Sequence, residues 1–488
     1  MKKRGQNPKS CECYFSDMKK LNIHLVGIKG VGMTPLAIIA KEAGFTVSGS
    51  DIDMEFITDA TLKHAKITPL IGFSKDHIKN PDLVIITGAH GGFDNPEANA
   101  AKIKGIKVIT QGEAVGLFME GAILGKKLIG ISVAGTHGKT TTTAMLATIF
   151  KESQLDPSYV IGTGNVGNLG SPGHFGKGKY FIAEADEYAT EPKYNKKSKF
   201  LWQFPKIAII TNIEFDHPDI FNSLDDVRNA YLMFCNQLYP KSVLIVYGDD
   251  PEIKKVVHGT NIINITYGFN QDNDYVLENF HTSGDHIFFR LISKGTVISE
   301  FMLKVVGEHN ALNAAASIIA SMESGLSIEK IKKGLLSFSG SKRRLEYIGE
   351  LLSGARVYDD YAHHPTEIKT TLKALRSQFP NKKIVVIFQP HTYSRTKKLF
   401  GEFSNSFSAV DSVMLTDIYA SLREEVDPSV SSEILYNVMK SQSKDIIYLP
   451  TLPDVVKYIN EKRYRSDTVI VTMGAGDIYT LHRELKFL

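Results

Sequence analysis

The segment VAGTHGKTTTTA, at residues 133–144, most strongly limits what this 488-residue chain can fold into. It follows an apolar, strand-like run, KLIGISVAG, and precedes apolar residues at helical spacing: Met145, Leu146, Ile149 and Phe150. A glycine-rich turn between a strand and a helix directs backbone N–H groups and the helix dipole toward one point, which favours phosphate. The segment therefore predicts a phosphate-binding loop in an α/β domain.

This loop departs from the common pattern G-x-x-x-x-G-K-[ST], because Val133 stands where the first glycine is expected. Two essential groups remain. Lys139 offers a cation for terminal phosphates, and Thr140 offers a hydroxyl ligand for Mg²⁺. The alternative is an ordinary glycine turn with a surface lysine. The strand before the loop, the helix after it and the four consecutive threonines favour the phosphate-binding interpretation.

Acidic residues follow two further strand-like runs in the same region. Glu184, Asp186 and Glu187 come after KYFIA, and the segment TNIEFDH after KIAII carries Asn212, Glu214, Asp216 and His217. In isolation, such acids are more often part of a solvated turn. Beside a phosphate loop they become candidate Mg²⁺ ligands, because Mg²⁺ prefers hard oxygen donors.

A second glycine loop, GIKGVGM, lies near the N-terminus between an apolar strand and a helical stretch. Its glycines, Gly27, Gly30 and Gly32, do not have the G-x-G-x-x-G spacing of dinucleotide enzymes. Asp51 ends the next strand, so a nicotinamide-dependent oxidoreductase is an alternative that the local pattern leaves open. Strand-like and helical stretches continue to alternate, which predicts a parallel sheet with flanking helices.

The chain length exceeds that of one ordinary core, and strand and helix patterns alternate again after about residue 341. We expect three consecutive α/β domains: a Rossmann-like N-terminal domain at 21–125, a central ATPase of the P-loop type at 126–340, and a Rossmann-like C-terminal domain at 341–488. Residues 1–20 are expected to form a flexible tail. Between residues 272 and 305, strand-like alternation predicts a small antiparallel patch.

Composition and charge limit the kinds of partner and the compartment that we expect for this chain. The formal net charge is only +4 and no basic stripe stands out, so we expect no nucleic-acid partner. No apolar run approaches the ~20 residues of a membrane span, so we expect no membrane insertion. The three cysteines, Cys11, Cys13 and Cys235, do not make a disulfide framework and indicate a reducing, cytoplasmic environment.

Several spaced motifs together resemble the Mur ligase family over residues 20–488. They are AGTHGKTTT, EADE, TNIEFDH, GEHNALNA, KRRLE, DDYAHHPTE, FQPHTYSRT, LTDIYAS and GAGDI, in that order. The resemblance implies an ATP-dependent ligase of peptidoglycan precursor synthesis that phosphorylates a carboxylate before an amine attacks it. It implies ATP as co-substrate, Mg²⁺, and UDP-N-acetylmuramate and L-alanine as partners, with the enzyme a monomer or homodimer in the cytoplasm.

The resemblance also implies roles for individual residues. Lys139, His217 and Arg344 are the expected catalytic residues, and Thr140, Glu184 and His217 the expected metal ligands. ATP would be held by Gly135, Thr136, His137, Gly138, Lys139, Thr140, Thr141, Asn310, Asn313, Arg344 and Asp360. The sugar nucleotide and the amino acid would be held by Gly27, Gly30, Gly32, Asp51, His391, Tyr393 and Arg395. Because Arg344 and Asp360 belong to a different domain from Lys139, we expect domain closure to complete the site.

Two departures from the family bear on the substrate. Thr392 stands where an arginine is usual, so one cationic contact to L-alanine is missing, for which Arg423 is a possible substitute. The stretch YLMFCN lacks the carbamylated lysine of later-acting members, which leaves the L-alanine branch or the branch that attaches the L-Ala-γ-D-Glu-diaminopimelate tripeptide. The third-domain motifs favour L-alanine. A nucleotide-binding scaffold without chemistry is a further alternative, opposed by the presence of Glu184, Asp186 and His217.

Overall fold

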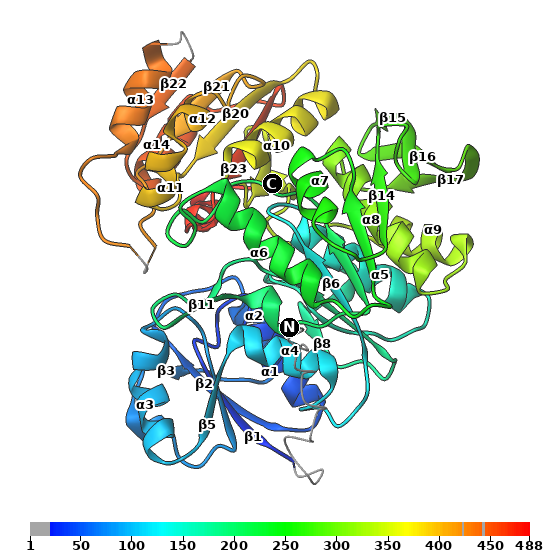
Figure 1. Cartoon of the computed structure of the whole chain (residues 1–488). Coiled ribbons are helices and arrows are strands. Elements are labelled where there is room, and N and C mark those ends of the chain that lie inside the picture. Colours follow the sequence, from blue (N-terminus) through cyan, green and yellow to red (C-terminus); the bar gives the residue numbers. More distant parts are fainter. Residues whose placement is uncertain (1–19, 422–423, 442–444) are drawn as a thin grey trace.

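The computed structural model describes residues 20–421, 424–441 and 445–488, and these form three main sheets that follow one another along the chain, besides one two-stranded hairpin (Figure 1). The sheets occupy residues 22–110, 129–303 and 346–473. The predicted α/β class is confirmed. The predicted tail, with Cys11 and Cys13, and the possible substitute Arg423 lie outside the described residues.

The first sheet has five parallel strands in the order β3-β2-β1-β4-β5. Because β1 lies between β2 and β4, the direction of winding reverses at the carboxyl end of β1, where α/β sheets bind ligands. The strands are β1 (Asn22–Val26), β2 (Thr46–Asp51), β3 (Leu70–Ile71), β4 (Leu83–Ile86) and β5 (Lys107–Thr110), and the helices are α1 (Thr34–Glu42), α2 (Asp59–His64), α3 (Pro96–Ile103) and α4 (Gln111–Glu120).

The second sheet has ten strands in the order β17-β16-β15-β14-β13-β12-β6-β9-β7-β8. They are β6 (Ile129–Ala134), β7 (Ser158–Val160), β8 (Gly173–His174), β9 (Tyr180–Glu184), β12 (Ile207–Ile210), β13 (Val243–Tyr247), β14 (Asn264–Gly268), β15 (Tyr275–Ser283), β16 (His286–Ser293) and β17 (Thr296–Leu303). The strands from β14 to β7 are parallel, and β15, β16 and β17 pair antiparallel, as the alternation between residues 272 and 305 predicted.

Helices cover both faces of this second sheet: α5 (Lys139–Glu152), α6 (Leu224–Gln237), α7 (Pro251–His258), α8 (Glu308–Glu323) and α9 (Ile328–Ser337). Alternate residues of β12 explain the arrangement. Ile207 and Ile209 pack into the core with α5, α8 and α9, whereas Ala208 and Ile210 pack against α6 on the other face. A short hairpin, β10 (Ala189–Glu191) and β11 (Asn195–Ser198), stands apart from the main sheet.

The third sheet has six strands in the order β18-β19-β23-β20-β21-β22, parallel except for the β18–β19 pair. The strands are β18 (Glu346–Glu350), β19 (Arg356–Asp360), β20 (Lys383–Phe388), β21 (Ser412–Leu415), β22 (Asp445–Tyr448) and β23 (Thr468–Met473). The helices are α10 (Pro365–Gln378), α11 (Tyr393–Lys398), α12 (Phe400–Ser404), α13 (Ser432–Ser441) and α14 (Leu452–Lys462). Among the described residues, no helix is both long and apolar enough to cross a membrane.

Candidate active site

The phosphate loop connects β6 to α5 and is built on two glycines with left-handed backbone conformations. Gly135 has a φ of 136° and Gly138 has a φ of 82°. A Cβ atom at Gly135 would lie 1.9 Å from Thr211 Oγ1, so a larger residue is excluded there. The first residue of α5 is Lys139, and the first turns of this 14-residue helix therefore point their free N–H groups at the loop.

Lys139 is largely but not fully buried in the loop and faces carboxylates. Its Nζ donates hydrogen bonds to Gly135 O at 2.6 Å and to Glu187 Oε2 at 2.9 Å. Burial opposes the charge, but Glu187 and Asp186 outweigh it and raise the pKa of Lys139. Lys139 is therefore a permanent cation whose present counter-ion is Glu187, and an incoming phosphate would compete with Glu187 for it.

Two of the predicted metal ligands meet directly. Thr140 Oγ1 donates to Glu184 Oε2 at 3.2 Å, and Gly162 N donates to Glu184 Oε1 at 2.6 Å. Burial raises the pKa of Glu184, a cost that a bound cation would offset. A hydroxyl and a carboxylate beside a phosphate loop fit the oxygen preference of Mg²⁺.

The third predicted metal ligand, His217, lies a short distance away. Its Nε2 is 3.7 Å from Glu187 Oε1, and ligand atoms of Asp186, Glu187 and His217 all lie within 4.8 Å of one another. Lys199 lies 2.8 Å from Asp186 Oδ2; although burial opposes ionisation, Lys199 and Lys139 hold the pKa of Asp186 well below its usual range. His217 thus belongs to a carboxylate group adjacent to the Thr140–Glu184 pair.

Arg344, which lies just before the first strand of the third sheet, contacts the phosphate loop. Arg344 Nη2 donates to Thr140 Oγ1 at 3.3 Å, although the two residues are 204 positions apart in the sequence. Asp360 ends β19 and accepts hydrogen bonds from the N–H groups of Leu345 and Ala362, each at 2.7 Å. Burial raises the pKa of Asp360 to about 7. Residues near the second sheet and the third sheet therefore contact each other at the phosphate loop.

A cavity of about 390 Å³ extends from the phosphate loop to these third-sheet residues, a size typical of small-ligand pockets. Asn310 and Asn313, at the start of α8, line it; Asn310 Nδ2 donates to Val306 O at 2.7 Å. His309 is held neutral, because burial and Arg344 lower its pKa to about 4. Of the predicted ATP contacts, the lining includes His137, Gly138, Thr141, Asn310, Asn313, Arg344 and Asp360.

A second cavity of about 250 Å³ adjoins the other side of the loop and joins the first sheet to the second. Its lining includes Gly32, Thr136, Lys139, Thr140, Glu184, His217 and Arg344. Gly27, with a φ of 78°, and Asp51 lie farther back at the carboxyl ends of β1 and β2, where Asp51 accepts a hydrogen bond from Lys29 N at 2.7 Å. The first glycine loop therefore opens toward the same space as Lys139.

The predicted amino-acid contacts lie apart from both cavity linings. Arg395 donates from Nε to Asp216 Oδ1 at 2.8 Å and lies 3.1 Å from His391 Nδ1, so its guanidinium is already engaged. Tyr393 opens α11, and Thr392 before it has a φ of 68°. Asp216 lines the second cavity, and Arg395 contacts Asp216 without lining that cavity itself.

Sequence reasoning missed a cluster of histidines and glutamates at the join between the second and third sheets. His137 Nδ1 lies 3.2 Å from Glu367 Oε1, and Thr366 Oγ1 donates to Glu214 Oε2 at 2.6 Å. Burial opposes protonation, but Glu367 and Glu214 raise the pKa of His137 to about 10. The motif DDYAHHPTE contains His364 and Glu367, and its concentration of titratable groups at a helix start was the available signal.

Comparison with known protein families gives three matches in chain order. Residues 22–122 match the model of the Mur ligase family catalytic domain, residues 133–321 the Mur ligase middle domain, and residues 343–476 the Mur ligase glutamate ligase domain. Each match contains one of the three sheets or most of it.

Individual proteins are similar over nearly the whole chain. A protein of Desulfitobacterium hafniense named UDP-N-acetylmuramate–L-alanine ligase is 40% identical over 95% of this chain and 99% of its own. The protein of the same name from Acetivibrio thermocellus is 40% identical over 94% of each chain. The crystal structure of UDP-N-acetylmuramate-alanine ligase from Thermotoga maritima has a TM-score of 0.78 and 30% identity over 95% of this chain and 97% of its own. A murein peptide ligase from Psychrobacter arcticus, at 24% identity, shares the fold with a TM-score of 0.69 over 95% of this chain and 97% of its own.

Proposed function

This chain belongs to the Mur ligase family, and we propose that it joins L-alanine to the carboxylate of UDP-N-acetylmuramate at the expense of ATP. The observation that carries the proposal is the 40% identity to an L-alanine ligase over 95% of the chain, which spans all three sheets rather than the nucleotide site alone. The reaction is a step in peptidoglycan precursor synthesis.

The chemistry begins with two anions that repel each other. A carboxylate oxygen of the muramyl group attacks the γ-phosphorus of ATP, the bond to the β-phosphate oxygen breaks, and ADP leaves. The amine of L-alanine then attacks the acyl carbon, and the resulting tetrahedral intermediate expels inorganic phosphate as the amide forms. Cations must neutralise the anions before they meet, which is the main demand on the protein.

Lys139 and Arg344 meet that demand from opposite sides. Lys139 lies in the loop between the carboxylates and the second cavity, and Arg344 reaches Thr140 from the third sheet. We propose that both contact the phosphates of ATP, and that Gly135, Thr136, His137, Gly138, Thr140 and Thr141 supply the cradle. One Mg²⁺ held by Thr140 and Glu184 would polarise the γ-phosphate, and His217 would help to hold a second Mg²⁺. Holding the reactants in line lowers the barrier further, by about 7–11 kcal/mol at best.

We assign the adenosine of ATP and the sugar nucleotide to different cavities. We propose that the adenosine lies in the 390 Å³ cavity, with Asn310 and Asn313 at the base and Asp360 at the ribose. The sugar nucleotide enters over Gly27, Gly30, Gly32 and Asp51, because this loop opens to the second cavity. His391, Tyr393 and Arg395 receive L-alanine, which requires Arg395 to exchange part of its contact with Asp216. On this assignment, residues 21–125, 126–340 and 341–488 act as the sugar-nucleotide, ATP and amino-acid domains.

Specific structural features distinguish the L-alanine ligase from the alternative functions. A nicotinamide-dependent oxidoreductase leaves the phosphate loop and the reach of Arg344 to Thr140 unexplained. A scaffold without chemistry leaves the pairing of Thr140 with Glu184 unexplained. The tripeptide branch remains the second candidate because the stretches EADEY, KSKFLW and NIEFDHPDIF resemble the tripeptide ligase more than the L-alanine ligase. All assigned residues belong to one chain, so a monomer or homodimer suffices, and we place the enzyme in the cytoplasm, where ATP is available.

The test uses the purified full chain with Mg²⁺, ATP and UDP-N-acetylmuramate, followed by phosphate release and by mass spectrometry of the nucleotide product. L-alanine is compared with glycine, L-serine and the L-Ala-γ-D-Glu-diaminopimelate tripeptide. We expect L-alanine to give the highest kcat/KM, with glycine reduced about 10–200-fold by loss of one methyl contact. A higher kcat/KM for the tripeptide would support the tripeptide ligase instead of the L-alanine ligase. Absence of any nucleotide product would reject both activities.

A further inference from the structure

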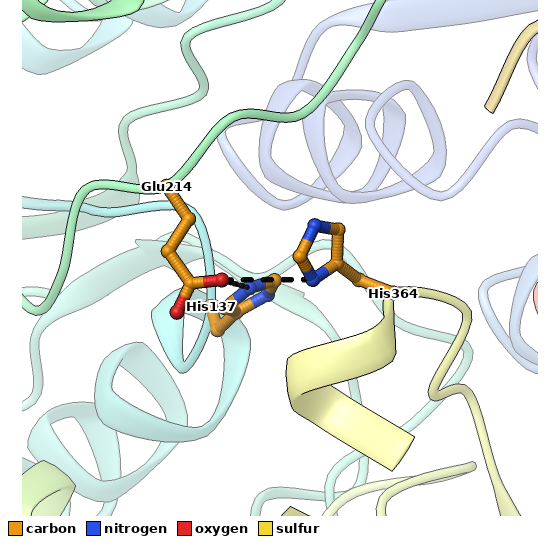
Figure 2. A group of neighbouring side chains, drawn as sticks. All are labelled: His137, Glu214 and His364. Atoms are coloured by element: carbon orange, nitrogen blue, oxygen red, sulfur yellow. Dashed lines mark ion pairs between the residues drawn. The ribbon is translucent and has the colours of Figure 1, made fainter. Parts of the chain in front are cut away.

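Three side chains from separate segments converge at the join between the second and third sheets (Figure 2). His137 comes from the phosphate loop, Glu214 from the segment after β12, and His364 from the residue before α10. Glu214 Oε2 lies 3.5 Å from His137 Nε2 and 3.7 Å from His364 Nδ1, and the three ligand atoms lie within 4.8 Å of one another. Tetrahedral ligands at bond lengths of 2.0–2.2 Å lie roughly 3.4 Å apart, so only small shifts would close this group around an ion.

Each ring turns one nitrogen toward Glu214, and an ion bound there would replace the proton that His137 carries at neutral pH, because Glu367 and Glu214 raise the pKa of His137 to about 10. His364 Nε2 lies 3.2 Å from the carbonyl oxygen of Phe215, which only accepts, so Nε2 carries the proton. The lone pair of His364 Nδ1 accepts a hydrogen bond from Thr366 N at 3.3 Å, which a bound ion would displace. His137 Nδ1 faces the Glu367 carboxylate at 3.2 Å, which favours the proton on Nδ1. His137 Nε2 is buried and has no hydrogen-bond partner among the described residues.

These outer contacts are those of metal-binding imidazoles. A ligating histidine usually donates its second ring N–H to a carboxylate or a backbone carbonyl, and here one ring has each. The Glu214 carboxylate is itself fixed, because Thr366 Oγ1 donates to its Oε2 at 2.6 Å. The ligands are therefore oriented by groups that do not touch the ion.

The geometry points to a binding site for one Zn²⁺-class divalent transition ion, held by His137, Glu214 and His364. Two imidazoles and one carboxylate suit such ions, whereas Mg²⁺ prefers an all-oxygen shell. This site differs from the Thr140, Glu184 and His217 positions assigned to Mg²⁺, and it does not depend on the proposed ligase activity. Without the ion, protonated His137 supplies the positive charge between the carboxylates of Glu214 and Glu367.

The position gives the ion a structural consequence. His137 and Glu214 belong to the second-sheet region, and His364 begins a helix of the third-sheet region. One bound ion would cross-link the phosphate loop to α10, in addition to the Arg344 contact with Thr140. Binding should therefore raise the unfolding temperature, because an ion that binds only the folded chain stabilises it by mass action.

The experiment measures ion binding by the full chain without nucleotide, so its outcome is independent of catalysis. Cys11 and Cys13 are replaced by serine throughout, because tail thiols bind zinc themselves. After removal of metals with a chelator, Zn²⁺ affinity and stoichiometry are measured by competition with a chromophoric chelator, and Co²⁺ is added to record its visible absorption. We expect one tightly bound Zn²⁺ per chain, a strong Co²⁺ band typical of low coordination, a higher unfolding temperature, and no displacement by excess Mg²⁺.

The variants are Glu214→Gln and His364→Asn, each expected to weaken Zn²⁺ binding at least tenfold and to remove the Co²⁺ band. Asparagine keeps a helix-capping side chain before α10. His174→Asn is the matched control, because His174 also contacts two carboxylates, Glu42 and Asp156, but through opposite ring nitrogens. Circular dichroism verifies the fold of each variant, and Glu214→Gln alone decides if His364→Asn does not fold.

Three results would overturn the proposal. The first is no Zn²⁺ bound by the unsubstituted chain. The second is unchanged affinity in a folded Glu214→Gln or His364→Asn variant. The third is loss of the Co²⁺ band on His217→Asn instead, which would place the ion in the neighbouring group of Asp186, Glu187 and His217.

Discussion

Arg395 in α11 and Asp216 after β12 form a buried ion pair at 2.8 Å that joins the third-sheet region to the second. Both side chains are about 95% buried. Asp216 is buried at a cost, and Arg395 holds its pKa well below the usual range. The pair therefore links Arg395, which is proposed to hold the amino acid, with a residue that lines the second cavity.

Asp216→Asn should destabilise the chain by about 3–5 kcal/mol, because it leaves the Arg395 guanidinium buried without its counter-ion. Chemical denaturation monitored by circular dichroism measures the loss. Lys397→Met is the matched control in the same helix, since the Lys397–Asp427 pair is exposed to solvent and should contribute little to stability. Equal stability of the two variants would contradict the importance assigned to the buried pair.

Lys139→Ala should abolish measurable turnover, reducing phosphate release by at least about 100-fold, because it removes the cation nearest the phosphate cradle. Mass spectrometry of the product is the readout. Lys151→Ala serves as control, because Lys151 lies in the last turn of the same helix and is exposed. Near-normal product formation by Lys139→Ala would refute the role given to this lysine.

Asp360 should make stability depend on pH. Its pKa is about 7 in the folded chain and about 3.9 in an unfolded one, so the folded chain binds more protons between these values. The burial cost is therefore absent below about pH 4, and stability falls as the pH rises toward 7. Asp360→Asn removes the charge and its pH dependence, although its amide nitrogen faces one of the two N–H donors, so the variant should gain stability relative to the natural chain as the pH rises.

Unfolding temperatures of the natural chain and Asp360→Asn between pH 5 and 8 provide the check. The difference between the two should widen with rising pH. Parallel curves would show that Asp360 is already ionised throughout this range.

Thr392 should be strained, because its φ of 68° and ψ of 142° fall in a region that β-branched residues rarely adopt. Thr392→Gly should stabilise the chain by about 1 kcal/mol, since relief of strain exceeds the extra entropy of glycine in the unfolded state. The hydrogen bond from residue 392 N to Tyr419 O is retained in glycine. A lower unfolding temperature for Thr392→Gly would show that the threonine side chain contributes more than the strain costs.

The sequence predicted those parts of the molecule that depend on local pattern. The strand, glycine turn and helix around Lys139 were readable because apolar spacing and glycine positions act within a few residues. Glu184 and His217 were readable as strand-end residues, because parallel strands bring their carboxyl ends to one edge. The antiparallel strands β15 to β17 were visible in their alternation.

The pairing of side chains across regions was not readable in the same way. Thr366 and Glu214 are 152 positions apart, and Arg395 and Asp216 are 179 apart. Their contacts depend on how two separate sheets are placed against each other, which no local periodicity records. For the same reason, no sequence pattern indicated that Glu187 is the counter-ion of Lys139, or that His137 and His364 face one carboxylate.

The central claim is that the cations around the phosphate loop allow a carboxylate to be phosphorylated, and oxygen transfer tests it most directly. UDP-N-acetylmuramate labelled with ¹⁸O in its carboxylate is incubated with ATP, Mg²⁺, L-alanine and the purified chain, and the released phosphate is analysed by mass spectrometry. The account predicts one ¹⁸O atom in each phosphate, because the acyl phosphate breaks at its carbon–oxygen bond. Unlabelled phosphate accompanying full product formation would contradict it.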